Sequence, residues 1–225
     1  MLRPYFCSIS SSDPLFAAVT YGLIMFFFAL IGRGQEVPDT DVLRLYGGSG
    51  TIEVISEDGK VREISTGELR EISKVVRKGE TVRTGKDSYA VMLKGERIGM
   101  RLGVETTVDT RPDVKAGHSL SLLRGKLNVK VRSLKDKKRR QEFRLKMPST
   151  VLAVKGTSFF GEVTGELETG GVNDGEIEVV RLINGNERKA AVTGGNALDL
   201  NREGVARIRK LSREEIGYQR FYGGA

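Results

Sequence analysis

Two strand-like runs meet at a single proline within residues 142–160. In the first run, apolar residues alternate with Arg144 and Lys146, which is the period of a strand with one buried and one wet face. Pro148 lacks the N–H that a sheet ladder needs, and Gly156 tolerates backbone twist that other residues resist. The stretch therefore predicts a strand, a corner, a second strand and another corner.

Short runs of this kind continue along most of the 225-residue chain, which has 28 glycines, 5 prolines and no tryptophan. Its 39% hydrophobic content suffices for a core. Regular short strands punctuated by glycine predict an all-β fold, either a β-roll, a β-helix-like coil or a two-layer β-sandwich. The predicted strands are 42–46, 51–56, 60–64, 80–84, 88–94, 97–102, 104–110, 119–123, 126–132, 141–147, 150–154, 158–164, 176–183, 187–193 and 197–200.

Local signals add one hairpin and two helices. Asn184-Gly185 can adopt positive φ at both positions, so it predicts a tight antiparallel ribbon between its flanking strands. The capping-box pattern Ser-x-x-Glu occurs at 65–68, followed by apolar residues at helical spacing through Val76, and again at 212–215. A short helix is therefore predicted at each place.

One pattern occurs twice. An apolar residue, a glycine three positions later and two further alternating apolar residues stand at 122–129 and again at 172–179. Gly125 and Gly175 are in register in the two copies, which favours a coil-like, repeated arrangement of strands.

The only membrane-like segment is 15–31, which carries no charged residue. Seventeen residues at helical rise span about 25 Å, between the core of a signal peptide and a transmembrane helix. Residues 1–34 are therefore predicted to be a hydrophobic helix that serves as a signal peptide cleaved after Gly34 or as a membrane anchor, with a buried core helix as the alternative. Residues 35–41 form a linker. Cys7, the single cysteine, precedes the segment, so the body of the exported protein would carry no thiol.

The second run of the opening stretch reads Val154-Lys155-Gly156-Thr157-Ser158-Phe159 and resembles the Val-Arg-Gly-Thr-x-Phe signature of the FecR domain, with lysine in place of arginine. The resemblance also includes Gly79 to Leu93, Leu120 to Val131 and Asp174 to Val179. It extends over most of the chain, so 42–200 is taken as a FecR-like domain and 201–225 as a C-terminal tail with a short helix. The motif residues assigned to structural roles are Gly79, Thr84, Val154, Lys155, Gly156, Thr157 and Phe159.

The resemblance implies a protein exported to the periplasm or another extracytoplasmic site, with anchoring in the inner membrane as one form. The iron-dicitrate regulators that name the family carry a cytoplasmic anti-sigma domain before the membrane segment. Only fourteen residues precede Leu15 here, too few to fold, so direct capture of a sigma factor in that manner is not expected. The chain is expected to be a FecR domain alone, exported or tethered.

Catalytic, metal and cofactor sites find little support. His118 is the only histidine and Ser119 is beside it, so a Ser-His or Cys-His nucleophilic site lacks its parts. Glu176 and Glu178 fit the wet face of a strand better than a glycosidase pair. The sequence Asn173-Asp174-Gly175 matches only a fragment of a calcium-binding loop and lacks the remaining oxygen ligands. No catalytic, metal-binding or cofactor-binding residue is therefore assigned.

Basic residues crowd one strand-turn-strand unit, and the chain has a formal charge of +8. Such a patch attracts anionic polymers or lipid head groups, whereas nucleic acid is disfavoured because aromatic residues do not interleave with the basic ones. A solvated turn that protects a sheet edge is the alternative. The residues assigned to the patch are Lys135, Lys137, Lys138, Arg139 and Arg140.

These observations favour a non-enzymatic FecR-like domain of the cell envelope that binds or scaffolds through sheet edges and the basic turn. Its partner would be an envelope protein or an anionic envelope polymer or lipid, and 15–31 would contact the membrane if uncleaved. One alternative is a signal-sensing regulator that acts through a membrane partner. Another is a carbohydrate-active envelope enzyme.

Overall fold

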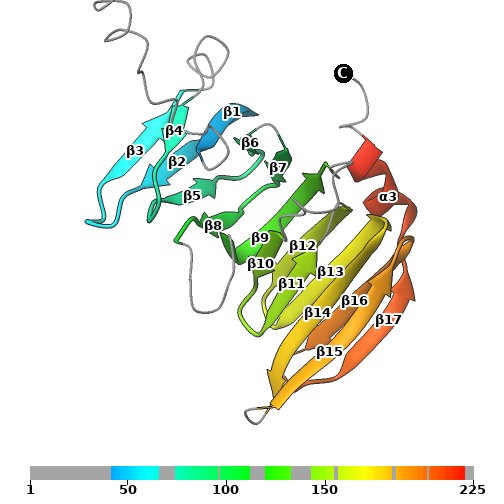
Figure 1. The fold of residues 1–225 in the computed structure, drawn as a ribbon. Helices are drawn as coiled ribbons and strands as arrows, with labels where there is room; N and C mark the ends of the chain where they lie inside the picture. The colour runs from blue at the N-terminus through cyan, green and yellow to red at the C-terminus, as the bar shows by residue number, and fades with distance from the viewer. Residues whose placement is uncertain are drawn as a thin grey trace, which may run out of the picture. The chain divides into compact units, whose positions relative to one another are not determined.

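The computed structural model describes residues 42–65, 74–95, 97–111, 120–132, 143–154, 157–183, 186–201 and 203–220, all of them within one compact unit, Thr40–Ala225. Their secondary structure is nearly all β, as predicted (Figure 1). The strands are β1 Leu43–Ser49, β2 Ile52–Ile55, β3 Val61–Ile64, β4 Lys74–Val76, β5 Thr81–Thr84, β6 Tyr89–Lys94, β7 Ile98–Leu102, β8 Thr107–Asp109, β9 Leu120–Val131, β10 Phe143–Lys146, β11 Thr150–Val154, β12 Ser158–Thr164, β13 Leu167–Asp174, β14 Glu176–Ile183, β15 Asn186–Thr193, β16 Asn196–Asn201 and β17 Ala206–Lys210, and the helix is α3 Arg213–Arg220.

Hydrogen bonds join these strands into one open sheet, which folds into two layers that share β9. The helix-bearing layer has the order β4–β1–β6–β7–β9–β12–β13–β16–β17. The opposite layer has the order β3–β2–β5–β8–β9–β10–β11–β14–β15. Every described pairing is antiparallel except β9 with β10. A β-helix pairs its strands in parallel, so the β-helix-like alternative is wrong.

Strand β9 crosses from one layer to the other at Gly125. Before the glycine, Leu122 pairs with Val108 in the opposite layer, and after it Leu127 pairs with Leu102 and Gly161 in the helix-bearing layer. Gly125 has a φ of +84°, which allows the change of direction without breaking the strand. The prediction of two separate strands, 119–123 and 126–132, is therefore wrong, because the glycine is a bend within a single strand.

The second copy of the repeated pattern makes a similar crossing. Gly175, with a φ of +91°, joins β13 in the helix-bearing layer to β14 in the opposite layer. A threonine lies against each crossing glycine: a Cβ on Gly125 would lie 2.4 Å from Oγ1 of Thr106, and one on Gly175 would lie 2.4 Å from Cγ2 of Thr157. The repeated pattern thus corresponds to a repeated crossing between layers.

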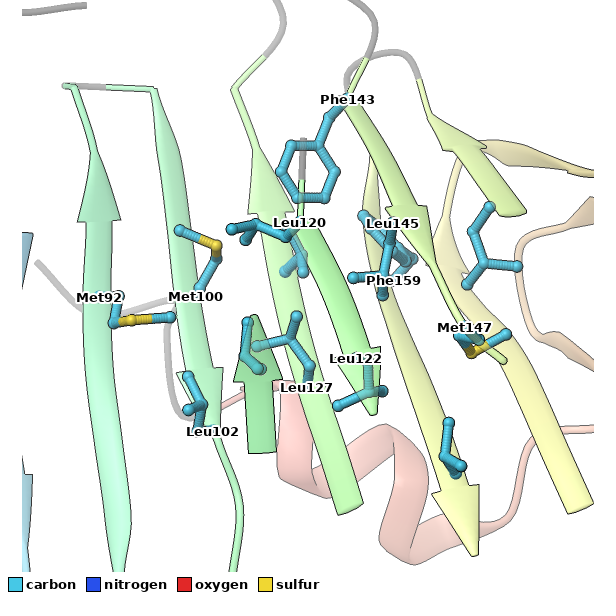
Figure 2. Packing of buried hydrophobic residues seen from close by; sticks show 14 of the residues in the cluster. Met92, Met100, Leu102, Leu120, Leu122, Leu127, Phe143, Leu145, Met147 and Phe159 are labelled. Carbon is cyan, nitrogen blue, oxygen red and sulfur yellow. The ribbon is translucent and has the colours of Figure 1, made fainter. Parts of the chain in front are cut away.

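One continuous core fills the space between the layers. Figure 2 shows Met92 and Met100 from the helix-bearing layer and Leu145 from the opposite layer among its side chains. Phe143 of β10 and Phe159 of β12 bring their ring centroids to 6.1 Å across the layers, a favourable distance for tilted aromatic rings. Alternation within each strand supplies these inward side chains.

Helix α3 packs on the outer face of the helix-bearing layer, where Ile216 contacts a small buried cluster formed by Phe160, Ala197 and Leu211. The predicted capping box at its start is confirmed. The N–H of Glu215 donates to Oγ of Ser212 at 3.2 Å, and the N–H of Ser212 donates to Oε2 of Glu215 at 2.7 Å.

Glu215 also ties the helix to β17. Its carboxylate accepts from the Arg209 guanidinium at 2.8 and 2.9 Å, and the same guanidinium donates to Asp199 of β16 at 2.8 Å. These contacts lower the pKa of Glu215 to about 2, with the hydrogen bonds from Arg209 as the main cause.

Three further predictions need correction. The helix predicted through Val76 is wrong at its end, because Lys74–Val76 is strand β4 and pairs with β1. There Val75 is 44% exposed and Val76 is 4% exposed, which is the alternation of a strand. The sequence prediction also missed β13 and β17. The Gly170-Gly171 pair weakened the strand signal of β13, and the exposed, charged β17 has no apolar alternation.

The ribbon predicted around residues 184–185 is confirmed by the antiparallel pairing of β14 with β15. The turn residues themselves, the hydrophobic helix predicted within 1–34 and the capping box at 65–68 beyond Ser65 lie outside the described residues. Among the residues that the structure describes, no helix has the length and apolar character needed to cross a membrane.

Replacement of Gly125 by alanine tests the crossing. A Cβ there would lie 2.6 Å from the Cα of Thr106 and 2.9 Å from the Glu105 carbonyl oxygen, both backbone atoms. We expect Gly125→Ala to lower the free energy of unfolding by about 2–5 kcal/mol, from left-handed strain and overpacking together. Gly59→Ala is the matched control, since Gly59 has a φ of +80° and nothing within 4 Å of its Cβ position. It should lose only about 1–2 kcal/mol in the same urea titration.

The lowered pKa of Glu215 predicts how helix docking depends on pH. A carboxyl group whose pKa falls from 4.5 to about 2 on folding stabilises the native state fully above pH 4.5, and this contribution is lost as the pH falls towards 2. We expect Glu215→Gln to remove part of the acid sensitivity of unfolding across that window. Equal acid sensitivity in the variant and the parent protein, measured by denaturation at successive pH values, would contradict the assignment.

Candidate functional site

A hollow of about 170 Å³ opens on the outer face of the helix-bearing layer, above β7 and β9. Met100 and Leu102 of β7 point into the core. Gly99, which precedes Met100, and Arg101, which lies between the two, therefore face outward. Gly99 leaves room there, because a Cβ at this position would meet only Cδ2 of Leu93, at 3.8 Å. The lining residues are Leu93, Arg97, Gly99, Met100, Arg101, Asn128, Val129, Lys130, Arg132 and Ser158.

Asn128 lies in the wall of this hollow with an unsatisfied amide. The register of β9 places it opposite Arg101 of β7 on one side and Phe160 of β12 on the other. Asn128 is only 5% exposed, and its buried side-chain atoms Nδ2 and Oδ1 have no hydrogen-bond partner among the described residues. A buried amide without partners costs about 1–3 kcal/mol, so this position is unfavourable for the free protein.

The hollow is strongly basic. Arg97, in the turn before β7, and Arg101, within β7, border it on one side. Lys130, near the end of β9, and Arg132, directly after β9, also border it. No aspartate or glutamate is present among the described residues of its lining. Four cations in one concave site produce a positive potential that the low-dielectric protein wall strengthens.

Two cation–π contacts position side chains in and beside the hollow. The guanidinium of Arg101 lies 4.5 Å from the ring centroid of Tyr89, and Nζ of Lys126 lies 4.5 Å from the ring centroid of Phe160. Lys126 also forms an ion pair with Glu162 at 3.0 Å. Phe160 itself belongs to the buried cluster beneath α3, so the helix supports the ring that flanks Asn128.

A larger hollow of about 740 Å³ lies where the bend of β9 at Gly125 and the end of β12 meet the start of α3. Its lining mixes acidic residues such as Glu105 and Glu214 with the basic residues Arg124 and Lys126. The mixed charge gives this second hollow no clear preference for a ligand of either sign.

The basic segment predicted from sequence, Lys135, Lys137, Lys138, Arg139 and Arg140, lies outside the described residues, as do Lys155 and Gly156. Arg132, which follows β9 directly and precedes this segment by three positions, is the last described residue before it and lines the hollow. In the sequence, Lys130 and Arg132 of the hollow therefore come a few positions before the predicted basic turn.

The other motif residues are part of the framework. Thr84 is buried; its Oγ1 donates to the Gly103 carbonyl at 2.6 Å and accepts from the Thr106 N–H at 2.9 Å. Thr157 is buried, and its carbonyl accepts from the Val131 N–H at 2.9 Å. Gly79 has a φ of +93° in the turn before β5. Val154 and Phe159 are buried in the core between the layers.

Sequence reasoning missed Asn128, Gly99, Arg97 and Arg101 as site residues. Asn128 stands between the apolar Leu127 and Val129, so it has the ordinary pattern of a polar residue on a wet face. Only the register of three strands reveals that its amide is buried beside a hollow.

Comparison with known families accounts for the central part of the chain. Residues 80–185 match the family model for the FecR protein. This central region is a FecR-like domain. The match runs from the start of β5 to the connection between β14 and β15, and it includes the whole of the outer hollow. The sheets continue beyond the FecR match on both sides, through β1 to β4 and through β15 to β17.

Two crystal structures of a "putative anti-sigma factor" from Parabacteroides distasonis ATCC 8503, at 1.65 and 2.50 Å resolution, are similar to the chain. Each aligns with a TM-score of 0.48 and 13% sequence identity, covering 61% of this chain and 62% of the other. This chain thus spans less than two thirds of the length of those proteins. No curated protein matches it.

The unsatisfied amide predicts an unusual result of mutation in the FecR domain. Asn128→Leu removes a buried group without partners, so we expect the free energy of unfolding to rise by about 1–3 kcal/mol. Asn196→Leu is the matched control, because Nδ2 of Asn196 donates to the carbonyls of Thr193 at 3.0 Å and Gly194 at 3.2 Å. This control should lose about 0.5–1.5 kcal/mol. Destabilisation of both variants in urea would show that Asn128 is satisfied in solution.

Proposed function

We propose that this FecR-domain chain is a non-enzymatic, signalling-related protein of the cell envelope, and that its β domain binds a partner through the basic outer face. The observation that carries the proposal is the basic hollow, which Arg97, Arg101, Lys130 and Arg132 border without an acidic residue among its described lining. A concave site of one sign of charge concentrates ligands of the opposite charge.

The basic turn predicted from sequence extends this proposal. Lys137 to Arg140 follow Arg132 by a few residues, so they would add long-range attraction for an anionic partner while the hollow supplies the close contacts. Binding or scaffolding, rather than catalysis, also agrees with membership of the central region in the FecR family. Residues 1–34 would deliver the domain to the envelope as a signal peptide or an anchor.

Site-specific crosslinking in living cells tests the proposal. A photo-crosslinking p-benzoylphenylalanine replaces Lys130, which is exposed beside the hollow, in the full-length protein. The same residue replaces Val61 of β3, which is 56% exposed, in the control. We expect a discrete adduct from position 130 and none from position 61, and charge reversal at Lys137 to Arg140 should weaken the adduct at position 130.

Two outcomes would contradict the proposal. Absence of an adduct at position 130, or the same adducts from both positions, would exclude this face as the binding surface. Turnover of envelope glycans by the purified full-length protein, abolished by replacing one carboxylate, would contradict the non-enzymatic assignment.

A further inference from the structure

We propose that the outer face of the helix-bearing layer binds an acidic, amphipathic α-helix of a partner protein over strand β6. This inference rests on the proposed function, because it takes the basic outer face as the binding surface and names the class of its partner. Three observations support it: an apolar strip on β6, cations on both sides of that strip, and the way in which α3 covers the other half of the same face.

Strand β6 carries an apolar strip on its outward side. Ala90 and Met92 are fully buried in the core, so the alternate residues of β6 face outward. These are Tyr89, Val91 and Leu93, and each of them is partly exposed. At about 3.4 Å per residue, the strip is about 14 Å long.

The apolar surface continues on the two strands beside β6. Tyr46, the extra residue of a bulge in β1, is 60% exposed, and Val75 of β4 is 44% exposed. Among the residues that the structure describes, α3 is the only helix, and the buried cluster beneath it draws on Phe160 of β12 and Ala197 of β16. The side chains around β6 are therefore the part of this face that α3 leaves open.

Cations flank the strip on both sides. Arg44 of β1 lies opposite Leu93, and Arg101 of β7 lies opposite Val91. Neighbouring strands are about 4.8 Å apart, so these two arginines are about 10 Å apart across the strip, which is the diameter of a helix with its side chains. No described outward-facing residue of β4, β1, β6 or β7 is acidic. Charge complementarity therefore favours an acidic partner on both sides of an apolar stripe.

The sheet beneath the strip favours a helix over an extended segment. Strand β6 pairs with β1 and β7, β1 also pairs with β4, and β7 also pairs with β9. Their ladders leave no sheet edge under the strip, so an extended segment buried on this face would lose water from its N–H and C=O groups without gaining partners. A helix satisfies its backbone internally and can bury an apolar stripe at no such cost.

Helix α3 shows the same chemistry on the other half of the face. Its Ile216 contacts the cluster of Phe160 and Ala197, while Glu215 in its acidic first turn pairs with Arg209 of β17 at 2.8 Å. Strand β13, which lies between β12 and β16, is four strands from β6, or about 19 Å. Helices pack at 8–10 Å from one another, so the face has room for a second helix beside α3.

Helical peptides test the partner class with the full-length protein in phosphatidylcholine nanodiscs, and empty nanodiscs serve as the blank. The probe is a labelled peptide of about 18 residues, or five helical turns, with leucine along one face and glutamate on both sides of that face. One control peptide has the same composition in an order that gives no apolar face, and another has lysine in place of glutamate. At fixed ionic strength we expect the probe to bind at least about tenfold more tightly than either control, because only the probe combines an apolar stripe with negative charge.

Three outcomes would overturn the proposal. Equal affinity of the reordered acidic peptide would show that the face recognises charge alone. No binding of the probe would exclude an acidic helix as the partner. Displacement of the probe by phosphatidylglycerol vesicles, as effective as displacement by excess unlabelled probe, would assign the face to an anionic membrane surface instead.

Variants locate the binding on this face. Tyr46→Glu places a negative charge beside the strip, and we expect it to weaken binding at least about tenfold by repelling the acidic helix. Val61→Glu makes the same change of charge at an exposed residue of β3, in the opposite layer, and should leave affinity unchanged. Equal losses in the two variants, or no loss in Tyr46→Glu, would refute the site. If Tyr46→Glu fails to fold by circular dichroism, Val75→Glu provides the same test.

The two proposals can fail separately. If position 130 yields a discrete adduct in cells while the probe does not bind, the helical partner is wrong and binding by this face stands. If the probe binds but position 130 yields no adduct, the proposed function fails and the helix-binding chemistry of the face stands. If both results are negative, both proposals fail.

Discussion

The architecture depends on one strand that belongs to two layers. Strand β9 pairs with β8 and β10 before Gly125 and with β7 and β12 after it, so a single backbone connects the sheets. Thr106 fills the inside of the bend, and its Oγ1 accepts from the Lys126 N–H at 3.0 Å immediately after the crossing. Thr84 in turn holds Thr106, which connects the crossing to β5. A glycine is required because a side chain at this φ would strike backbone atoms.

This crossing also sets the position of the candidate site. Once β9 enters the helix-bearing layer, Leu127 and Val129 point into the core, so Asn128 and Lys130 must point outward. The site is therefore built on the most central strand, where core packing fixes the backbone. Binding groups on such a rigid strand lose little conformational entropy when a ligand binds.

The outer face combines a buried polar group without a hydrogen-bond partner and a concentration of positive charge. Asn128 is buried without a partner, and four cations crowd beside it, which is a poor arrangement for stability alone. Natural proteins violate folding rules of this kind mainly where function requires it. The FecR match includes every lining residue of the hollow, whereas the flanking strands β1 to β4 and β15 to β17 extend the sheets beyond it.

The sequence alone determined the all-β class, most strand positions, the capping box of α3 and the FecR-like character of the central region, because these depend on alternation, glycine spacing and local motifs. It also marked Gly125 and Gly175 as equivalent positions. Only the tertiary structure decided that these glycines carry strands between layers, that Val76 belongs to a strand paired with β1, and that Asn128 is buried. Alternation reports which side chains share a face, but burial on the outer face depends on neighbouring strands and on α3, which come from distant parts of the chain.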